Sequence, residues 1–314
     1  MKFIPFLSIA LAACSNFPSS TAELQQDATA ADVSEDDCVF DSEDRFEPRT
    51  RLVKGPRAGY CLDSRVGRPV KRLTQSEAKE FGGSTDEYLT VANVSHLGEY
   101  YVAHIPRNKI KTGIFQLEYF PAIVPAGHTQ LRLKFEEGSP VTLVSQSKKE
   151  LTKVVKAQDL ILSVEAIGDP GYKYDLFRGM EDHFAAIHRI STLEDKYQHM
   201  IVKQKHRVEQ WKLNLNSIEL TAILDKYVQK SENAGTSTMY HTIFFNCTTE
   251  AVAAIDAGAR YNLLEKFGKF TAKTTDFYPN VIRISLQKRG LLPKFGKGND
   301  IAELDKDPSI APVK

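Results

Sequence analysis

One cysteine, set between an apolar run and a helix-forming stretch, constrains this sequence more than any other feature. Residues 241–245 are a short apolar run of β type, Asn246 and Cys247 follow, and residues 248–259 are mostly small and helix-forming. Asn is a favourable helix N-cap, so we expect a strand that ends at Asn246 and a helix that begins at Cys247. The N–H groups and the dipole at a helix start stabilise a thiolate relative to a thiol. The residues therefore indicate a nucleophile, and they leave open a small buried cysteine packed behind the helix.

The first residues have the pattern of an export signal. Lys2 is the only charge among them, residues 3–13 are largely apolar, and small residues precede Cys14. Such a run is too short to span a bilayer, and no other stretch reaches the length of about eighteen apolar residues that a spanning helix needs. Small residues before a cysteine match the lipobox, so we expect residues 1–13 to be a lipoprotein signal peptide and Cys14 to carry lipid. A plain secretory leader is the alternative.

In an exported protein, each of the four cysteines has an expected chemical state. Cys38 and Cys61 lie 23 residues apart in an irregular region, and an exported protein can form disulfides, so we expect these two to pair. Cys247 is then left as a free thiol. The expected location is the bacterial cell envelope, on the periplasmic face of a membrane. Ser15 after the lipidated cysteine favours the outer membrane.

Charge divides the chain into regions. Residues 23–47 hold ten acids and one base, a net charge of −9, whereas the whole chain carries +1. We expect residues 14–47 to be an acidic flexible tether, residues 48–84 an N-terminal segment, residues 85–292 the main domain and residues 293–314 a polar tail. The basic main part suits anionic lipid head groups, although a solvated surface of mixed charge is the more common explanation.

The sequence of the main domain predicts mostly strands, with a few helices. Strands are expected at residues 88–94, 100–105, 114–120, 127–135, 141–145 and 160–166, and more weakly at 184–190 and 207–215. Residues 138–140 form a turn, so residues 127–135 and 141–145 are expected to pair as a hairpin. Capping signals predict helices at residues 74–81 and 216–230. The pattern indicates an α+β fold in which helices pack on an antiparallel sheet.

A cysteine nucleophile needs a base, and the chain offers eight histidines. His128 opens a strand after Gly127, where a side chain can project from the end of a sheet. His241 is nearer in sequence, but six residues of extended strand would hold it about 20 Å from Cys247. His128 is therefore the better candidate, with a structural histidine as the alternative.

Other chemistries lack their motifs. There is no P-loop, G-x-G-x-x-G, G-x-S-x-G, C-x-x-C or H-E-x-x-H, so neither a cofactor nor a metal is expected. The spacing of the remaining histidines does not give the one-face pair of a helical zinc motif; these are His183, His188, His199 and His206. Residues 145–148 match S-x-x-K, but at a strand end rather than a helix start. Aromatic residues interleaved with bases are absent, so no nucleic-acid partner is expected.

Four short segments resemble the Lnb N-terminal periplasmic domain family. They are GHTQLR at residues 127–132, SVEA at 163–166, WKLNL at 211–215 and NCTT at 246–249. The resemblance covers residues 85–290. A histidine that precedes a cysteine at a helix start is also similar to circularly permuted papain-like folds, such as the lecithin–retinol acyltransferase group. The resemblance implies a circularly permuted papain-like fold for the main domain.

The resemblance also implies roles. Cys247 would be the nucleophile and His128 the general base of an acyl transfer through a thioester, with membrane lipids or lipoproteins as partners. The membrane-spanning part associated with Lnb-type enzymes is not in this sequence, and the lipobox stands in its place. The function expected is that of a membrane-anchored cysteine acyltransferase or acyl hydrolase. A cysteine amidase or peptidase of cell-wall peptides and a non-catalytic binding lipoprotein are the alternatives.

Supporting groups are harder to assign. Backbone N–H groups at the start of the helix, that of Cys247 included, could hold an oxyanion. Glu165, Gln146 and Ser145 lie on strands that follow His128 and could orient it, although a salt bridge is the commoner role for Glu165. Asn246 is expected to be the helix cap rather than a catalytic group.

Overall fold

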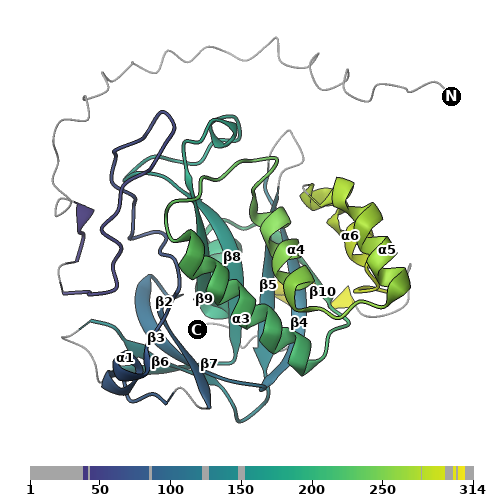
Figure 1. Cartoon of the computed structure of the whole chain (residues 1–314), viewed down its shortest axis with the longest axis horizontal. Helices are drawn as coiled ribbons and strands as arrows, with labels where there is room; N and C mark the ends of the chain where they lie inside the picture. The colour runs from purple at the N-terminus through teal and green to yellow at the C-terminus, as the bar shows by residue number, and fades with distance from the viewer. Residues whose placement is uncertain are drawn as a thin grey trace. The chain divides into compact units, whose positions relative to one another are not determined.

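The computed structural model describes residues 38–41, 43–84, 87–121, 127–147, 153–276, 278–293, 300–301 and 303–307. Cys14 and the expected signal peptide lie outside these residues. Within them, eleven strands form one sheet in the order β11-β10-β4-β5-β8-β9-β2-β3-β6-β7, with β1 alongside β2 (Figure 1). Paired strands are antiparallel except β2 and β9, which are parallel.

The strands match most of the runs expected from the sequence. They are β1 Lys71–Arg72, β2 Tyr88–His96, β3 Glu99–Pro106, β4 Ile110–Tyr119, β5 Gly127–Phe135, β6 Val141–Ser145, β7 Val154–Ala157, β8 Asp159–Ile167, β9 Ala185–Thr192, β10 Arg207–Lys212 and β11 Asp300–Ile301. The expected α+β class, with helices on an antiparallel sheet, is confirmed in this coarse form.

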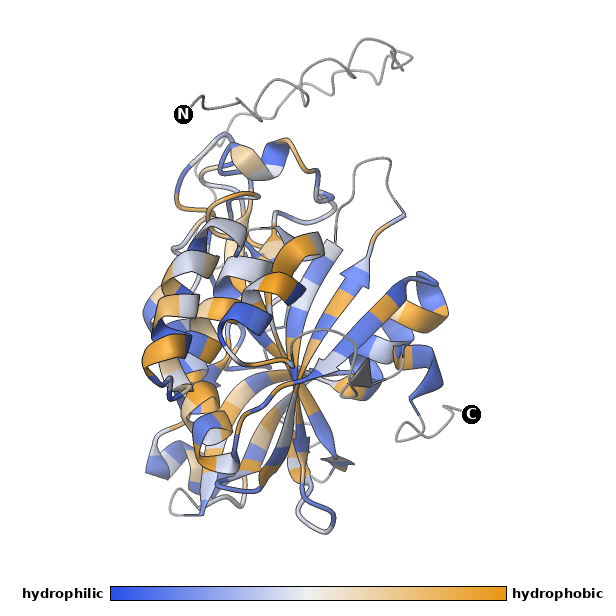
Figure 2. Ribbon diagram, turned by 90° about the vertical axis from the view of Figure 1, so that its right-hand side faces the viewer, coloured by the Kyte–Doolittle hydropathy of each residue, from blue (hydrophilic) through white to orange (hydrophobic). Residues whose placement is uncertain are grey.

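Two helices cover one face of the sheet. α3 Ser217–Ala234 and α4 Cys247–Gly258 pack on β4, β5, β8 and β9 and on each other, as Figures 1 and 2 show. Each begins at an asparagine cap. The i, i+3, i+4 spacing of Ile218, Leu220, Ile223, Leu224 and Tyr227 predicts a core face for α3, and α3 buries the last four, whereas Ile218 in its first turn is 62% exposed. The remaining helices are α1 Gln75–Glu80, α2 Leu193–Tyr197, α5 Leu263–Ala272 and α6 Ile282–Lys288, with the π-helical η3 Gln198–Lys203 and 3₁₀ turns η2 Arg178–Met180, η4 Lys273–Thr275, η5 Pro279–Val281 and η6 Leu304–Lys306. No helix among the described residues is long and apolar enough to cross a membrane.

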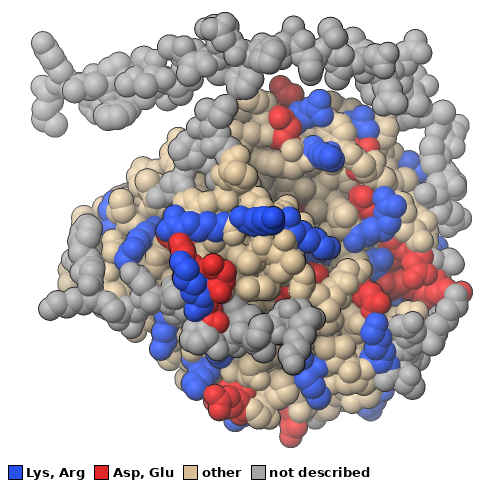
Figure 3. Space-filling model, turned by 180° about the vertical axis from the view of Figure 1, so that it is seen from behind, with Lys and Arg blue, Asp and Glu red and all other residues tan. Residues whose placement is uncertain are grey.

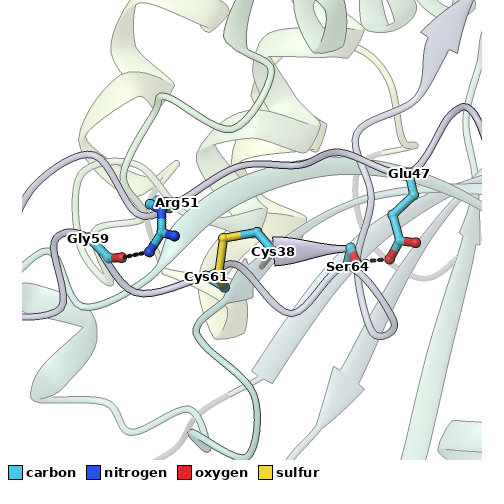
Figure 4. Close-up of a disulfide and its surroundings, with 6 residues drawn as sticks. All are labelled: Cys38, Glu47, Arg51, Gly59, Cys61 and Ser64. Atoms are coloured by element: carbon cyan, nitrogen blue, oxygen red, sulfur yellow. Dashed lines mark hydrogen bonds between the residues drawn. A yellow bond between two sulfur atoms is a disulfide. The ribbon is translucent and has the colours of Figure 1, made fainter. Parts of the chain in front are cut away.

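A disulfide joins Cys38 to the N-terminal segment at residues 48–84. Cys38 and Cys61, paired in the sequence analysis, form that bond with a Cα–Cα distance of 5.2 Å (Figure 4). Nearby, Arg51 Nη1 donates to the Gly59 carbonyl at 2.7 Å, and the Ser64 hydroxyl donates to the Glu47 carboxylate. The folded unit therefore begins earlier in the chain than the expected end of the tether at residue 47, since it includes Cys38 and buried residues such as Phe46.

The expected hairpin between β5 and β6 is wrong. β5 is paired on one side with β4 and on the other with β8, whereas β6 pairs with β3 and β7. Both edges of β5 are thus taken, and the chain crosses to the far part of the sheet after residue 135. A turn signal between two strands identifies the turn but not the partner, because strand pairing is decided by packing over the whole sheet.

The second face of the sheet carries a buried polar network. Arg132 on β5 is fully buried; its Nε donates to Asp159 Oδ1 at 2.7 Å and its Nη1 to Asp307 Oδ2 at 2.6 Å. Leu304, three residues before Asp307, packs with Met200 of η3. The polar tail expected at residues 293–314 is therefore corrected: β11 pairs with β10, and residues 303–307 pack against the sheet.

We expect Arg132→Met to lower the free energy of unfolding by about 3–5 kcal/mol, because it leaves the carboxylates of Asp159 and Asp307 buried without their cation. Urea unfolding followed by circular dichroism measures this. Lys109→Met is the control, since its ion pair with Glu136 is about half exposed (49% and 44%) and is expected to contribute less than about 1 kcal/mol. Equal effects of the two substitutions would contradict the assignment.

Candidate active site

Cys247 occupies the first position of α4, as the sequence predicts. The side-chain oxygen of Asn246 accepts from the backbone N–H groups of Thr248 at 2.9 Å and Thr249 at 3.0 Å, and the Thr249 hydroxyl accepts from Asn246 N at 2.9 Å. This capping box fixes where the helix begins and buries the thiol, which is 4% exposed. Asn246 is thus the cap, and Cys247 is the free cysteine among the described residues.

The run before Cys247 is not the expected strand. His241 and Phe245 form an isolated bridge that closes a tight turn, and His241 Nδ1 accepts from the backbone N–H groups of Ile243 and Phe244, each at 3.2 Å. Asn246 Nδ2 donates back to the Thr242 carbonyl at 2.7 Å. Local polar groups that satisfy a turn override the β propensity of the apolar residues. The imidazole of His241 therefore serves the turn.

His128 and Glu165 meet on adjacent strands. The β5–β8 register pairs Leu131 with Leu162, and continued along the strands it sets His128 opposite Glu165. His128 Nε2 lies 3.4 Å from Glu165 Oε1, an ion-pair contact in a site where the imidazole is 8% exposed. Gly127 permits β4 to approach closely here, since a Cβ at this position would lie 2.6 Å from the Glu118 carbonyl oxygen.

The start of α4 packs on the start of β5. The hydroxyl groups of Thr129 and Thr248 are 3.3 Å apart, and the backbone N–H of Thr129 faces the Cys247 sulfur. The His128 imidazole and the Cys247 thiol are close enough that each shifts the pKa of the other. The structure thus brings together the cysteine, the histidine and one of the three orienting candidates.

Buried charges set the protonation of the pair. Burial acts to lower the pKa of His128, but the Glu165 carboxylate and then the Cys247 sulfur outweigh it and raise the pKa to about 10. Burial acts to raise the pKa of Cys247, but the charge and hydrogen bond of His128, helped by the Thr129 N–H and the Thr248 hydroxyl, lower it to about 7. Between these two values the pair is a thiolate and an imidazolium.

Lys196 completes the charge balance. It extends from α2 to Glu165 Oε1 at 2.5 Å, and the Ser163 hydroxyl donates to the same oxygen at 2.8 Å. Burial acts to raise the pKa of Glu165, but His128 and Lys196 hold it well below its ordinary range. Glu165 therefore has both roles considered from the sequence, since it is in a salt bridge and also faces the imidazole.

Two tyrosines that sequence reasoning missed lie beside the thiol. The Tyr240 hydroxyl is 4.0 Å from Cys247 Sγ and also faces the Cys247 backbone N–H. Burial and then the Cys247 charge raise the pKa of Tyr240 well above its ordinary value, so its hydroxyl keeps its proton. Tyr174 packs edge-on against Tyr240 with ring centroids 5.8 Å apart. No spacing rule connects these positions, so the sequence carried no signal for them.

A pocket of about 400 Å³ opens at the thiol. One part of its lining is apolar or aromatic: Phe120, Val164, Ala166, Tyr174, Leu176, Met180, Tyr240, Ile243, Tyr278 and Pro279. Another part is polar: Glu118, Lys196, His199, Gln204, Thr242 and Asn246. The pocket also includes Gly127, His128, Glu165 and Cys247, so it is the space from which a substrate would reach the sulfur.

The remaining candidates lie elsewhere. Gln146 is buried at the other end of the sheet, where its Oε1 accepts from Asn93 N at 3.1 Å and its amide donates to Asp44 at 2.7 Å. Ser145 pairs with Tyr101 across β6 and β3. Both candidates are therefore wrong, because β8, β9, β2 and β3 separate β6 from β5. The four histidines considered for a metal have separate surroundings: His183 contacts Tyr172, His188 contacts Glu250, His206 contacts Glu118 and His199 lines the pocket.

We expect the alkylation rate of Cys247 by iodoacetamide to rise with an apparent pKa of about 7, rather than about 8.5 for an ordinary cysteine. The lowered pKa means that thiolate is present above pH 7 and is lost by protonation below it. In His128→Ala the counter-charge is gone and burial dominates, so the rate at pH 7.5 should fall at least about tenfold.

His104→Ala is the matched control, because His104 is also buried, on the distant strand β3. Its alkylation profile is expected to equal that of the wild type. A wild-type pKa of about 8.5 or above, or a profile that His128→Ala does not move, would contradict the ion pair.

The comparisons with known proteins agree with the motifs. The family model described as the Lnb N-terminal periplasmic domain matches residues 100–281, a span that includes His128, Glu165 and Cys247. Searches of curated proteins and of solved structures gave no match. The match covers more than half of the chain and confirms the resemblance, and the family is one of periplasmic, envelope-associated domains. The chain belongs to the Lnb N-terminal periplasmic domain family.

Proposed function

We propose that the protein is a thiol-dependent acyltransferase or acyl hydrolase that works through a thioester on Cys247. The observation that carries this proposal is the row Cys247–His128–Glu165, in which a buried thiol of lowered pKa lies at a helix start and beside an imidazole with a carboxylate partner. These are the parts of a cysteine nucleophile with its proton-transfer group and an orienting residue.

The first half of the reaction forms the thioester. The Cys247 thiolate attacks the carbonyl carbon of an acyl ester and pushes its electron pair onto the carbonyl oxygen. The backbone N–H of Cys247 and the hydroxyl of Tyr240 face the same place beside the sulfur and would donate to that oxyanion. When the intermediate collapses, the bond to the alcohol breaks and the imidazolium of His128 gives its proton to the leaving oxygen.

The second half releases the acyl group. His128 is now neutral and takes a proton from an incoming amine or water, which attacks the thioester carbonyl. Collapse of that intermediate expels the Cys247 thiolate and restores the ion pair with the imidazolium. Glu165 acts through His128 by stabilising its cation in both steps, so it is a positioning residue rather than a reacting one.

The pocket favours a substrate with an apolar chain and a polar head. Tyr174, Leu176, Met180 and Ile243 supply an apolar wall, whereas Lys196, His199 and Gln204 supply charged and polar groups. We propose lipid or lipoprotein acyl groups as the acyl donor. Attachment through lipid on Cys14, and preferentially to the outer membrane, is part of the same proposal and rests on the lipobox.

The order of the residues supports a circularly permuted papain-like arrangement. In papain-like enzymes the nucleophilic cysteine precedes the histidine in sequence and lies at a helix start. Here Cys247 also begins a helix, but His128 comes first and opens a strand of the sheet on which that helix packs. We propose that the two halves of such a fold are exchanged in chain order.

An amidase or peptidase of cell-wall peptides is the second candidate. The polar side of the pocket, with Glu118, Lys196 and Gln204, favours it. A purely binding lipoprotein is disfavoured by the charge of His128 near the Cys247 thiol, which lowers the pKa of the thiol.

We expect a diacylated lipopeptide to leave one acyl group on Cys247 as an adduct that neutral hydroxylamine removes, because hydroxylamine cleaves thioesters but not amides. Intact-protein mass spectrometry measures the adduct. Cys247→Ala should give none, and His128→Ala should slow its formation by about 10²–10⁴-fold. Tyr240→Phe keeps the ring and should slow it by about 10²-fold.

Glu250→Gln is the matched control, since Glu250 also lies on α4 and faces a buried histidine, His188, at 3.0 Å. Its rate of adduct formation should stay within about twofold of the wild type. An adduct that survives in Cys247→Ala would contradict the proposal. Cleavage of a muropeptide without adduct formation from lipid donors would favour the amidase.

A further inference from the structure

Helix α5 turns its large apolar side chains toward solvent rather than toward the core. Leu263, Leu264, Phe267 and Phe270 are 83%, 82%, 69% and 71% exposed, although a surface helix ordinarily turns its apolar stripe toward the core. The spacing i, i+1, i+4, i+7 puts the four side chains on one face of the helix. The side toward the protein holds small residues instead: Ala272 is fully buried, and Gly268 lies against α6.

The orientation of α5 is fixed by close packing. A Cβ at Gly268 would lie 1.8 Å from the carbonyl oxygen of Lys288, so only glycine lets α5 approach α6 in this way. Fully buried Arg289, just after α6, donates to Asp256 of α4 at 3.1 Å and to Asp276 at 2.7 Å. The apolar face cannot turn inward without breaking these contacts, so it remains on the outer surface of the fold, where a large exposed apolar patch commonly marks an interaction site.

The charge around this face is positive. Residues 256–290 hold seven bases and three acids, a net charge of +4. Lys266 and Lys273 are exposed on α5 and at its end, to one side of the apolar face. Lys and Arg side chains also form a band across the opposite face of the molecule (Figure 3). An apolar face flanked by lysines is complementary to anionic lipid head groups over acyl chains.

The chain leads from α5 to the wall of the pocket. Tyr278 and Pro279 follow α5 in the chain and line the pocket at Cys247, and Tyr278 is 56% exposed. Phe244, in the turn just before Cys247, is 75% exposed. Exposed aromatic residues are common where proteins meet a membrane interface. Exposed aromatic side chains thus lie beside the pocket as well as on α5.

We propose that α5 lies flat on an anionic lipid bilayer, with Leu263, Leu264, Phe267 and Phe270 in the acyl-chain boundary and Lys266 and Lys273 among the phosphates. This docking surface is separate from lipid attachment at Cys14. It orients the domain so that the Tyr278 side of the pocket faces the membrane. The inference rests on exposure, packing and charge, and it holds whether or not Cys247 performs acyl transfer.

The test places a tryptophan, whose indole is fluorescent, on the docking surface of α5. The protein is the full-length chain with Cys14→Ser, to remove lipid attachment, and Cys247→Ala, to prevent turnover of lipid. Trp211, the single native tryptophan, is 4% exposed, so a tryptophan substituted at position 270 reports separately. The probe is vesicles of brominated phosphatidylcholine and phosphatidylglycerol, which quench indole that enters the acyl region.

Phe270→Trp is expected to be quenched and blue-shifted, whereas the matched Ile218→Trp, at a 62% exposed position on α3, is not. Adding Lys266→Glu and Lys273→Glu to Phe270→Trp should weaken vesicle binding at least about tenfold. Vesicles of phosphatidylcholine alone should bind more weakly by a similar factor. The N-terminal apolar run is the same in all variants, so it contributes equally.

The proposal is overturned if the indole at position 270 is not quenched, or if the indole at position 218 is quenched equally. It is also overturned if emission at position 270 is already blue-shifted without vesicles and depends on protein concentration, because the partner of α5 would then be a second copy of the chain. Thioester formation on a soluble short-chain ester by the protein with Cys247 intact would be unaffected in each case, which keeps the two proposals distinct.

Discussion

The site depends on a row of alternating charges in a place with little water. Cys247, His128, Glu165 and Lys196 follow one another as thiolate, imidazolium, carboxylate and ammonium. A single charge at such depth would be neutralised by a shift of its pKa, but each member here is stabilised by the next. The row forms only where β5, β8, α2 and α4 meet. The protonation state of the thiol therefore depends on how these elements pack.

The proton balance changes how the histidine acts. A histidine of ordinary pKa would first remove the thiol proton as a general base. With the pKa of His128 at about 10 and that of Cys247 at about 7, the proton is already on the imidazole at neutral pH. In the proposed reaction its first task is to protonate the leaving group. Glu165 provides for this, because removing its charge would let burial lower the pKa of His128.

Local rules predicted the parts of the site that depend on neighbours in sequence. Asn246 before Cys247 is a cap with a known geometry, and the capping box of the structure follows from it. His128 could be selected by its place after Gly127 and by the family resemblance. Glu165 could not be ranked above Gln146 and Ser145, because that choice depends on β8, rather than β6, lying beside β5. Tyr240 and Lys196 depend on tertiary packing alone, and no pattern marked them.

The central claim is that Cys247 and His128 form an ion pair at neutral pH. The most direct measurement is the ¹⁵N chemical shift of the two His128 ring nitrogens at pH 8.5, in protein labelled at histidine, with His128→Gln to assign the signals. Both nitrogens should be protonated at this pH, with neutral imidazole appearing only as the pH approaches 10, and at lower pH in Glu165→Gln. A His128 ring that is already neutral at pH 8.5 in the wild type would contradict the account.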